Sequence, residues 1–155
     1  MNSLPEVVPD PEAQKRAPLF EEGVLELDVR DVMTPGVVTV SDHATLDEAV
    51  DAMAAHRIHA VLVVGDRAGT ALGWITTRGL LGLVGGEAET LATDAITERA
   101  TAIEPNASVR SAIYALSLSG GTRLLVRHRQ GDEVEGVISD YDLTVRATRL
   151  SRRPA

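Results

Sequence analysis

The sequence predicts a mixed α/β (α+β) protein built from two tandem β-α-β-β-α units. Residues 31–80 and 94–143 show the same pattern of residue types without a gap. Hydrophobic residues make up 44% of the chain and aromatic residues only 3%, so Val, Leu, Ile and Ala must build a core of packed layers. One unit is too small to close a core alone. We therefore expect the two units to pack sheet to sheet about a pseudo-twofold axis.

The internal repeat keeps one offset of 63 residues throughout. Asp31-Val32-Met33-Thr34 corresponds to Asp94-Ala95-Ile96-Thr97. At the same offset, Gly73-Trp74-Ile75-Thr76 corresponds to Gly136-Val137-Ile138-Ser139. A chance match would not stay in register over this length, so we infer a duplication.

Each unit is expected to contain the same elements in the same order. A helix should begin at Thr45, because Glu48 follows at the spacing of a capping box and apolar residues recur at helical intervals. The matching helix of the second unit begins at Ser108, and a last helix of each unit begins at Thr76 or Ser139. The predicted strands are 37–40, 60–64 and 72–76 in the first unit and 100–103, 123–127 and 135–139 in the second.

Composition and the repeat together predict the boundaries of the chain's segments. Residues 1–18 contain four prolines among charged and small residues, which is typical of a flexible tail. Apolar residues return in 19–28, and we expect this segment to dock on the folded body. The two units are 29–84 and 92–150, with a linker at 85–91 and a C-terminal tail at 151–155.

Charge and composition exclude several classes of function. The formal charge is −8 at pH 7, which argues against nucleic acid as the partner because binding to phosphates needs a basic face. The chain has no cysteine, so disulfides and thiolate chemistry are excluded. No stretch approaches the roughly 20 apolar residues of a membrane span, and the N-terminus lacks the apolar segment of a signal peptide. We expect a cytoplasmic protein without a membrane partner.

Two motifs carry a resemblance to a known family. Asp31-Val32-Met33-Thr34-Pro35 resembles the opening "DVMTP" of the CBS domain family, named after cystathionine β-synthase, and residues 136–143 (GVISDYDL) resemble its closing motif. The resemblance covers residues 29–148 and implies a stand-alone tandem CBS pair, or Bateman module. It implies a regulatory sensor rather than an enzyme. Such a sensor would form homodimers through its helices and bind AMP, ADP, ATP or S-adenosylmethionine, with no certain cofactor and no identified effector.

Ser139 and Asp142 are the strongest candidates for contacting this ligand. A carboxylate can accept hydrogen bonds from both vicinal hydroxyls of a ribose. Ser139, at the start of a helix, can bind a ribose or phosphate oxygen while the helix N-terminus faces the phosphate. The same Ser-x-x-Asp spacing is also that of a helix cap, and the two roles can coexist.

The first unit departs from this motif, because Gly79 stands at the position that corresponds to Asp142. Thr76 can still cap its helix, but no carboxylate is available for a ribose. We therefore expect one occupied cleft per chain, in the second unit. Thr76, His59 and Arg78 are weaker candidates for a second cleft, and for Arg78 an exposed helix residue is the alternative.

The resemblance implies further contacts in the second unit. The family's first strand contacts the purine, which here indicates Thr101, Ala102 and Ile103, with Leu124 on the neighbouring strand. The alternative is that these are ordinary core residues. Arg123 corresponds to a position where related nucleotide sensors bind phosphate, and an ion pair at the end of the strand is its alternative.

The sequence gives little support for a metal site or for a catalytic site. His56 and His59 form an H-x-x-H pair, but no cysteine or paired carboxylate completes a ligand set, so no metal is expected. No nucleophile motif is present. The alternative function is a ligand-free CBS scaffold that acts through protein–protein interaction.

A dimer is expected from helix faces rich in small and apolar residues: Ala49, Ala52, Met53, Ala112, Ala115 and Leu116.

Overall fold

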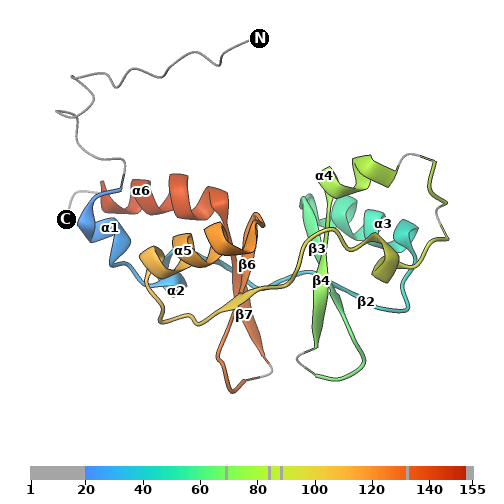
Figure 1. The fold of residues 1–155 in the computed structure, drawn as a ribbon, viewed down its shortest axis with the longest axis horizontal. Helices are drawn as coiled ribbons and strands as arrows, with labels where there is room; N and C mark the ends of the chain where they lie inside the picture. The colour runs from blue at the N-terminus through green and yellow to red at the C-terminus, as the bar shows by residue number, and fades with distance from the viewer. Residues whose placement is uncertain (1–19, 69, 84, 88, 132, 153–155) are drawn as a thin grey trace, which may run out of the picture.

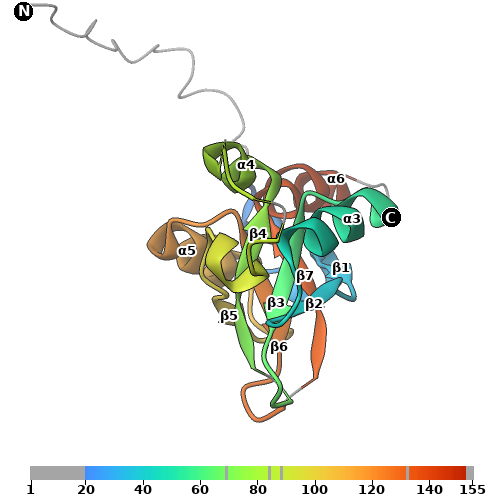
Figure 2. The same cartoon turned by 90° about the vertical axis from the view of Figure 1, so that its right-hand side faces the viewer.

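Two β-sheets lie at the centre of the molecule and face each other (Figure 1). The computed structural model describes residues 20–152, apart from residues 69, 84, 88 and 132. The expected N-terminal tail, 1–18, and residues 153–155 of the expected C-terminal tail lie outside the described residues. Helices pack on the outer face of each sheet, so the layers follow in the order helix, sheet, sheet, helix (Figure 1). Figure 2 views this stack from the side of the first unit.

The three-stranded sheet comes from the first unit and has the order β2-β3-β4. β2 (Thr39–Ser41) runs parallel to β3 (Ala60–Val64), and β4 (Ala71–Thr76) runs antiparallel to β3. A parallel pair needs a crossover connection, which α3 (Leu46–His56) supplies. α4 (Thr77–Leu80) follows β4 directly.

The four-stranded sheet has the order β1-β7-β6-β5 and comes mainly from the second unit. β5 (Ala102–Ile103) is parallel to β6 (Arg123–Arg127), and α5 (Val109–Ser119) connects them. β7 (Val134–Ser139) runs antiparallel to β6. The chain then enters a helical segment that contains a π-helical turn, Asp142–Arg146, and ends in α6 (Ala147–Ser151).

The N-terminal end of the described chain, up to the start of the first unit, packs on the second unit. It contains α1 (Glu22–Leu25), α2 (Val29–Val32) and β1 (Thr34–Pro35). Val24, Val29 and Val32 are fully buried in the core between the helices and the four-stranded sheet. β1 pairs antiparallel with β7, so residues that begin the first unit lie beside the last strand of the second. This crossing of the chain determines which residues share the functional site.

The segment that connects the two units packs against α3. It contains two 3-10 turns, Leu81–Leu83 and Ala92–Ala95. The N–H of Leu46, at the start of α3, donates to the Thr90 carbonyl at 2.6 Å. Ala92 and Ala95 are buried in the core beneath this helix.

The two long helices begin where their capping residues predict. Thr45 accepts from the Glu48 N–H at 3.2 Å, and the Glu48 carboxylate accepts from the Thr45 N–H at 3.0 Å, which completes a capping box. Ser108 caps α5 through the Ser111 N–H. Both helices end at a residue with a positive φ. This residue is Arg57 after α3 and Gly120 after α5.

Alternation along the central strands divides the apolar residues into three cores. In β6, Leu124 and Val126 face the helices while Leu125 faces the other sheet. Ala60 and Leu62 of β3 meet Leu125 and Trp74 in the core between the sheets. The predicted sheet-to-sheet packing is thereby confirmed. Within the described part of the chain, no helix is long and apolar enough to cross a membrane.

The extended segment that opens each unit is shorter than predicted. The first was expected at 37–40 and the second at 100–103, whereas β2 begins at Thr39 and β5 at Ala102. Val38 and Thr101, just before these strands, each keep one backbone hydrogen bond to the neighbouring strand, while Val37 and Ala100 pack into the core between the sheets.

The helix faces expected to form a dimer interface belong largely to the cores. Ala49, Met53 and Ala112 are buried within their own units. Ala52, Ala115 and Leu116 pack against the same cores. These residues therefore do not form the free apolar face that the sequence suggested.

Candidate functional site

A cleft of about 740 Å³ opens where the two units meet. Its volume falls within the roughly 300–1,000 Å³ that is usual for small-molecule sites. Both units contribute to its wall, which is lined by residues 34–38, 57–60, 74, 123, 137, 139–142 and 146.

The chain crossing described above creates this cleft. Thr34 pairs with Val137 and Pro35 with Gly136, so the segment that begins the first unit lies along the middle of β7. In the second unit, Arg123 pairs with Ser139, so the first residue of β6 lies next to the last residue of β7. The left-handed turn at Arg57 directs the chain from α3 into β3 along the opposite wall.

Ser139 and Asp142 lie in the cleft and bind each other reciprocally. Asp142 Oδ2 accepts from the Ser139 N–H at 3.0 Å and from the Ser139 hydroxyl at 3.1 Å. The Asp142 N–H donates to the Ser139 hydroxyl at 3.2 Å. The capping role that the spacing allowed is therefore present, and Asp142 is only 4% exposed. Its second oxygen, Oδ1, takes no part in this cap.

Arg146 is a cleft residue that the sequence reasoning missed. Its Nη1 donates to Asp142 Oδ1 at 3.2 Å and to Thr34 Oγ1 at 3.1 Å. Its side chain is 43% exposed, so it is only partly held. The signal in the sequence was an arginine four residues after Asp142 on a predicted helix, a spacing that brings opposite charges together. The π-helical turn carries both residues, and such turns are frequent at functional sites.

Arg123 contacts groups on two sides. Its Nε lies 3.6 Å from Glu98 Oε2, and Nε and Nη2 donate to the Thr122 hydroxyl at 3.2 and 3.0 Å. The guanidinium also lies over the Trp74 ring, 5.8 Å from its centroid. The ion pair considered as the alternative is therefore present, and Arg123 lines the cleft as well.

The charge of the cleft is opposite in sign to that of the chain. Three arginines (Arg57, Arg123 and Arg146) and two aspartates (Asp140 and Asp142) line it, so its formal charge is +1 in a chain of −8. A local positive field attracts anions. A buried carboxylate beside several guanidinium groups suits a ligand that carries both hydroxyls and phosphate.

The four residues expected to hold a purine do not line this cleft. Leu124 is fully buried in the helix-side core, because it lies on the opposite face of β6 from Leu125. Ala102 and Ile103 line a different cavity, of about 510 Å³, on the outer side of the sheet. Thr101 is half-buried and its carbonyl accepts from the Leu125 N–H. The cleft itself is lined instead by the segment 34–38 of the first unit.

The corresponding position in the first unit is filled by the chain itself. Thr76 caps α4 by accepting from the Gly79 N–H at 2.9 Å, and its hydroxyl lies 3.2 Å from that of Thr97. A Cβ at Gly79 would collide with the Thr97 side chain. Arg78 is exposed, whereas His59 lines the open cleft together with Ser139 rather than a second one.

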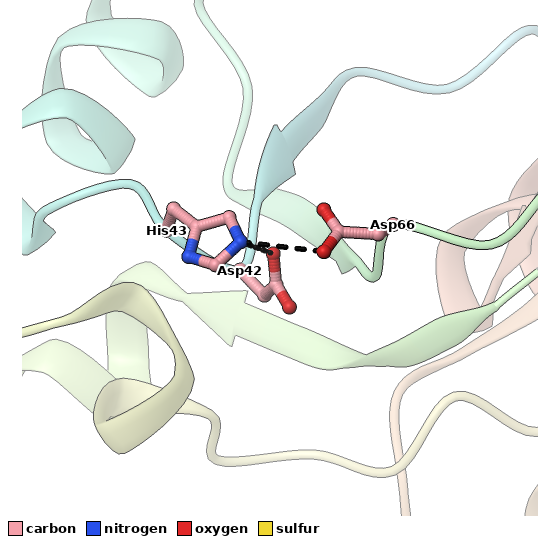
Figure 3. Close-up of side chains that lie close together, drawn as sticks. All are labelled: Asp42, His43 and Asp66. Atoms are coloured by element: carbon pink, nitrogen blue, oxygen red, sulfur yellow. Dashed lines mark hydrogen bonds and ion pairs between the residues drawn. The ribbon is translucent and has the colours of Figure 1, made fainter.

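An exposed cluster of possible metal ligands lies apart from the cleft (Figure 3). His43 Nε2 is 3.5 Å from Asp42 Oδ1 and 3.4 Å from Asp66 Oδ2. The side chains of His43 and Asp66 are 76% and 80% exposed, so these distances are those of a surface ion pair. The pair His56 and His59 is not part of any such cluster within the described ranges.

Comparison with known proteins relates the fold of this chain to one family. The model of the CBS domain family matches residues 29–86. The CBS-domain containing protein ATU1752 from Agrobacterium tumefaciens is similar in structure, with a TM-score of 0.64 and 25% identity over 76% of this chain and 96% of that chain. The protein AcuB from Vibrio cholerae, named for acetoin utilization, has a TM-score of 0.66 and 25% identity over 84% of this chain and 100% of that chain.

A third similar structure was determined with a bound nucleotide. The CBS domain protein PAE2072 from Pyrobaculum aerophilum, complexed with AMP, has a TM-score of 0.69 over 81% of this chain and 97% of that chain. At 19% identity, this likeness shows the fold alone. None of the curated proteins compared with the chain matches it. The predicted fold class and the resemblance to CBS domains are confirmed.

Proposed function

We propose that this chain, a member of the CBS domain family, is a regulatory module that binds a phosphate-bearing adenosine ligand in the cleft between its two units. The observation that carries the proposal is the buried Asp142 carboxylate, which keeps Oδ1 outside its cap within a cleft that is otherwise rich in arginine. PAE2072, which has the same fold, is described in complex with AMP. A cytoplasmic location, where such ligands are available, is part of the proposal.

The ligand's groups match the chemistry of the wall. Asp142 would accept from the ribose hydroxyls, as charge-assisted hydrogen bonds. Arg146 and Arg123 would face the phosphate, and the apolar side chains of Val37 and Ile58 would contact the base. Ser139 would contribute its hydroxyl, which already bonds Asp142. In this arrangement the base contacts come from the first unit and the sugar contacts from the second.

The positive charge of the cleft favours adenine nucleotides over S-adenosylmethionine. S-adenosylmethionine carries a cationic sulfonium, which three arginines would repel, whereas a phosphate would be attracted. The alternative function, a ligand-free scaffold, would leave Asp142 and the arginines without a ligand to bind. A homodimer is compatible with either function, and exposed apolar residues on α5, Tyr114 and Leu118, are its best candidates.

Calorimetry with AMP, ADP, ATP and S-adenosylmethionine tests the proposal. We expect saturable binding of at least one of the three nucleotides, close to one molecule per chain, and weak or no binding of S-adenosylmethionine. The melting temperature should rise with nucleotide concentration, since the ligand binds only the folded chain. Absence of binding for all three nucleotides at millimolar concentration would favour the scaffold function.

A further inference from the structure

Glu98, Thr122 and Arg123 of the second unit are the repeat counterparts of three residues that line the open cleft. At the offset of 63, Glu98 corresponds to Pro35, Thr122 to His59 and Arg123 to Ala60. Pro35, His59 and Ala60 line the open cleft. Their three counterparts instead contact one another.

The contacts of the Glu98 carboxylate are those that a bound anion would receive. Oε1 accepts from the Thr122 N–H at 2.9 Å and from the Thr122 hydroxyl at 2.9 Å. Oε2 lies 3.6 Å from Arg123 Nε. Oε2 is buried and has no hydrogen-bond donor within the described part of the chain, so the charge of Arg123 is what compensates it.

Arg123 connects this internal carboxylate to the open cleft. The side chain is 19% exposed, lines the cleft and lies over Trp74, which lines the cleft too. A phosphate near Arg123 would therefore share the guanidinium with Glu98. The two anions would repel each other across one cation, and Glu98 would lower the affinity for phosphate.

We propose that Glu98 is a specificity-determining residue, an internal counter-ion that weakens phosphate binding at Arg123 in the open cleft. This inference rests on the proposed function and deepens it. The residue acts only on the ligand's charge, so it should not affect recognition of the nucleoside part. Glu98 also connects the two clefts of the repeat. Its carboxylate fills the closed cleft, and through Arg123 it lowers the phosphate affinity of the open one.

The variant Glu98→Gln separates charge from packing. The glutamine carbonyl can keep both hydrogen bonds from Thr122, while the negative charge next to Arg123 is lost. We expect AMP to bind at least tenfold more tightly to this variant, because the negative charge that competes with the phosphate for Arg123 is removed. Affinity for adenosine, which has no phosphate, should stay within about twofold of that of the wild type.

Two further variants control for global effects. Glu104→Gln removes the same formal charge from an exposed residue outside the cleft and should change neither affinity. In an Arg123→Gln background, Glu98→Gln should give no gain for AMP. Should Glu98→Gln fail to fold, Glu98→Asp withdraws the carboxylate from Arg123 and should give a smaller gain for AMP in the same direction.

The outcomes distinguish this inference from the proposed function. If the wild type binds neither AMP nor adenosine, the proposed function fails. If the wild type binds AMP but Glu98→Gln leaves its affinity unchanged, or raises AMP and adenosine affinity equally, the role of Glu98 is overturned while nucleotide binding stands.

Discussion

Asp142 uses one carboxylate oxygen to cap its helix through Ser139 and leaves the other outside the cap. Capping and ligand binding are therefore not exclusive for this residue, because they use different atoms. Among the described residues, Oδ1 is held by Arg146 alone, whose side chain is 43% exposed and can shift toward a ligand. The buried position of Asp142 is secured by the cap, so the acceptor is pre-positioned before any ligand arrives.

Replacing Arg146 tests whether the partly exposed arginine contacts phosphate. Arg146→Ala should weaken AMP binding about tenfold or more, since a hydrogen bond to a charged group contributes roughly 1.5–3 kcal/mol. Adenosine affinity should stay the same or rise, because Asp142 Oδ1 no longer binds Arg146 and can accept from the ribose instead. Calorimetry with both ligands measures this. Arg149→Ala, an exposed change on the same helix outside the cleft, is the control. If both variants lose the same amount of AMP affinity, Arg146 does not contact the phosphate.

A carboxylate placed in the first unit, at the position that corresponds to Asp142, should not create a second nucleotide site. Gly79→Asp places a Cβ against the Thr97 side chain, so it should cost roughly 1–3 kcal/mol of stability, as overpacking does. Gly82→Asp meets no neighbouring atom and should leave the melting temperature nearly unchanged. We expect AMP binding to remain near one molecule per chain in both variants. Two AMP molecules per Gly79→Asp chain would show that the first cleft is open.

The oligomeric state tests the exposed face of α5. Tyr114 and Leu118 are 66% and 70% exposed and lie four residues apart on one side of the helix. We expect a dimer by light scattering at micromolar concentration and a monomer for Leu118→Asp. Leu81→Asp, at an equally exposed leucine elsewhere, should leave the dimer intact. A monomeric wild type would refute the dimer itself.

The repeat and the caps made most of the fold predictable. A constant offset predicted two units, and one unit's small size predicted that the sheets would pack together. Thr45 and Ser108 predicted the helix starts because capping is a local interaction between residues three apart. Local signals of this kind do not depend on where the rest of the chain lies.

The composition of the cleft was predictable only in part. Ser139 and Asp142 were found because their motif is continuous in the sequence, and Arg123 because it stands where the family resemblance implies a phosphate contact. Residues 34–38 were not, because they enter the site through pairing of β1 with β7, a contact between residues about a hundred positions apart. Ala102 and Ile103 correspond to Thr39 and Val40 of the first unit at the offset of 63, and they lie in another cavity.

Whether Asp142 accepts from the ribose is tested most directly by changing both partners of that contact. We compare AMP with 2′,3′-dideoxy-AMP on the wild type and on Asp142→Ala, together with the melting temperature of each protein. The wild type should prefer AMP by about 2 kcal/mol, near thirtyfold, from hydrogen bonds to a charged acceptor that water partly replaces. The preference should disappear in Asp142→Ala, whatever the loss of the cap does to stability. A preference that persists in Asp142→Ala, or that is absent from the wild type, would contradict the ribose role and leave Asp142 as a capping residue.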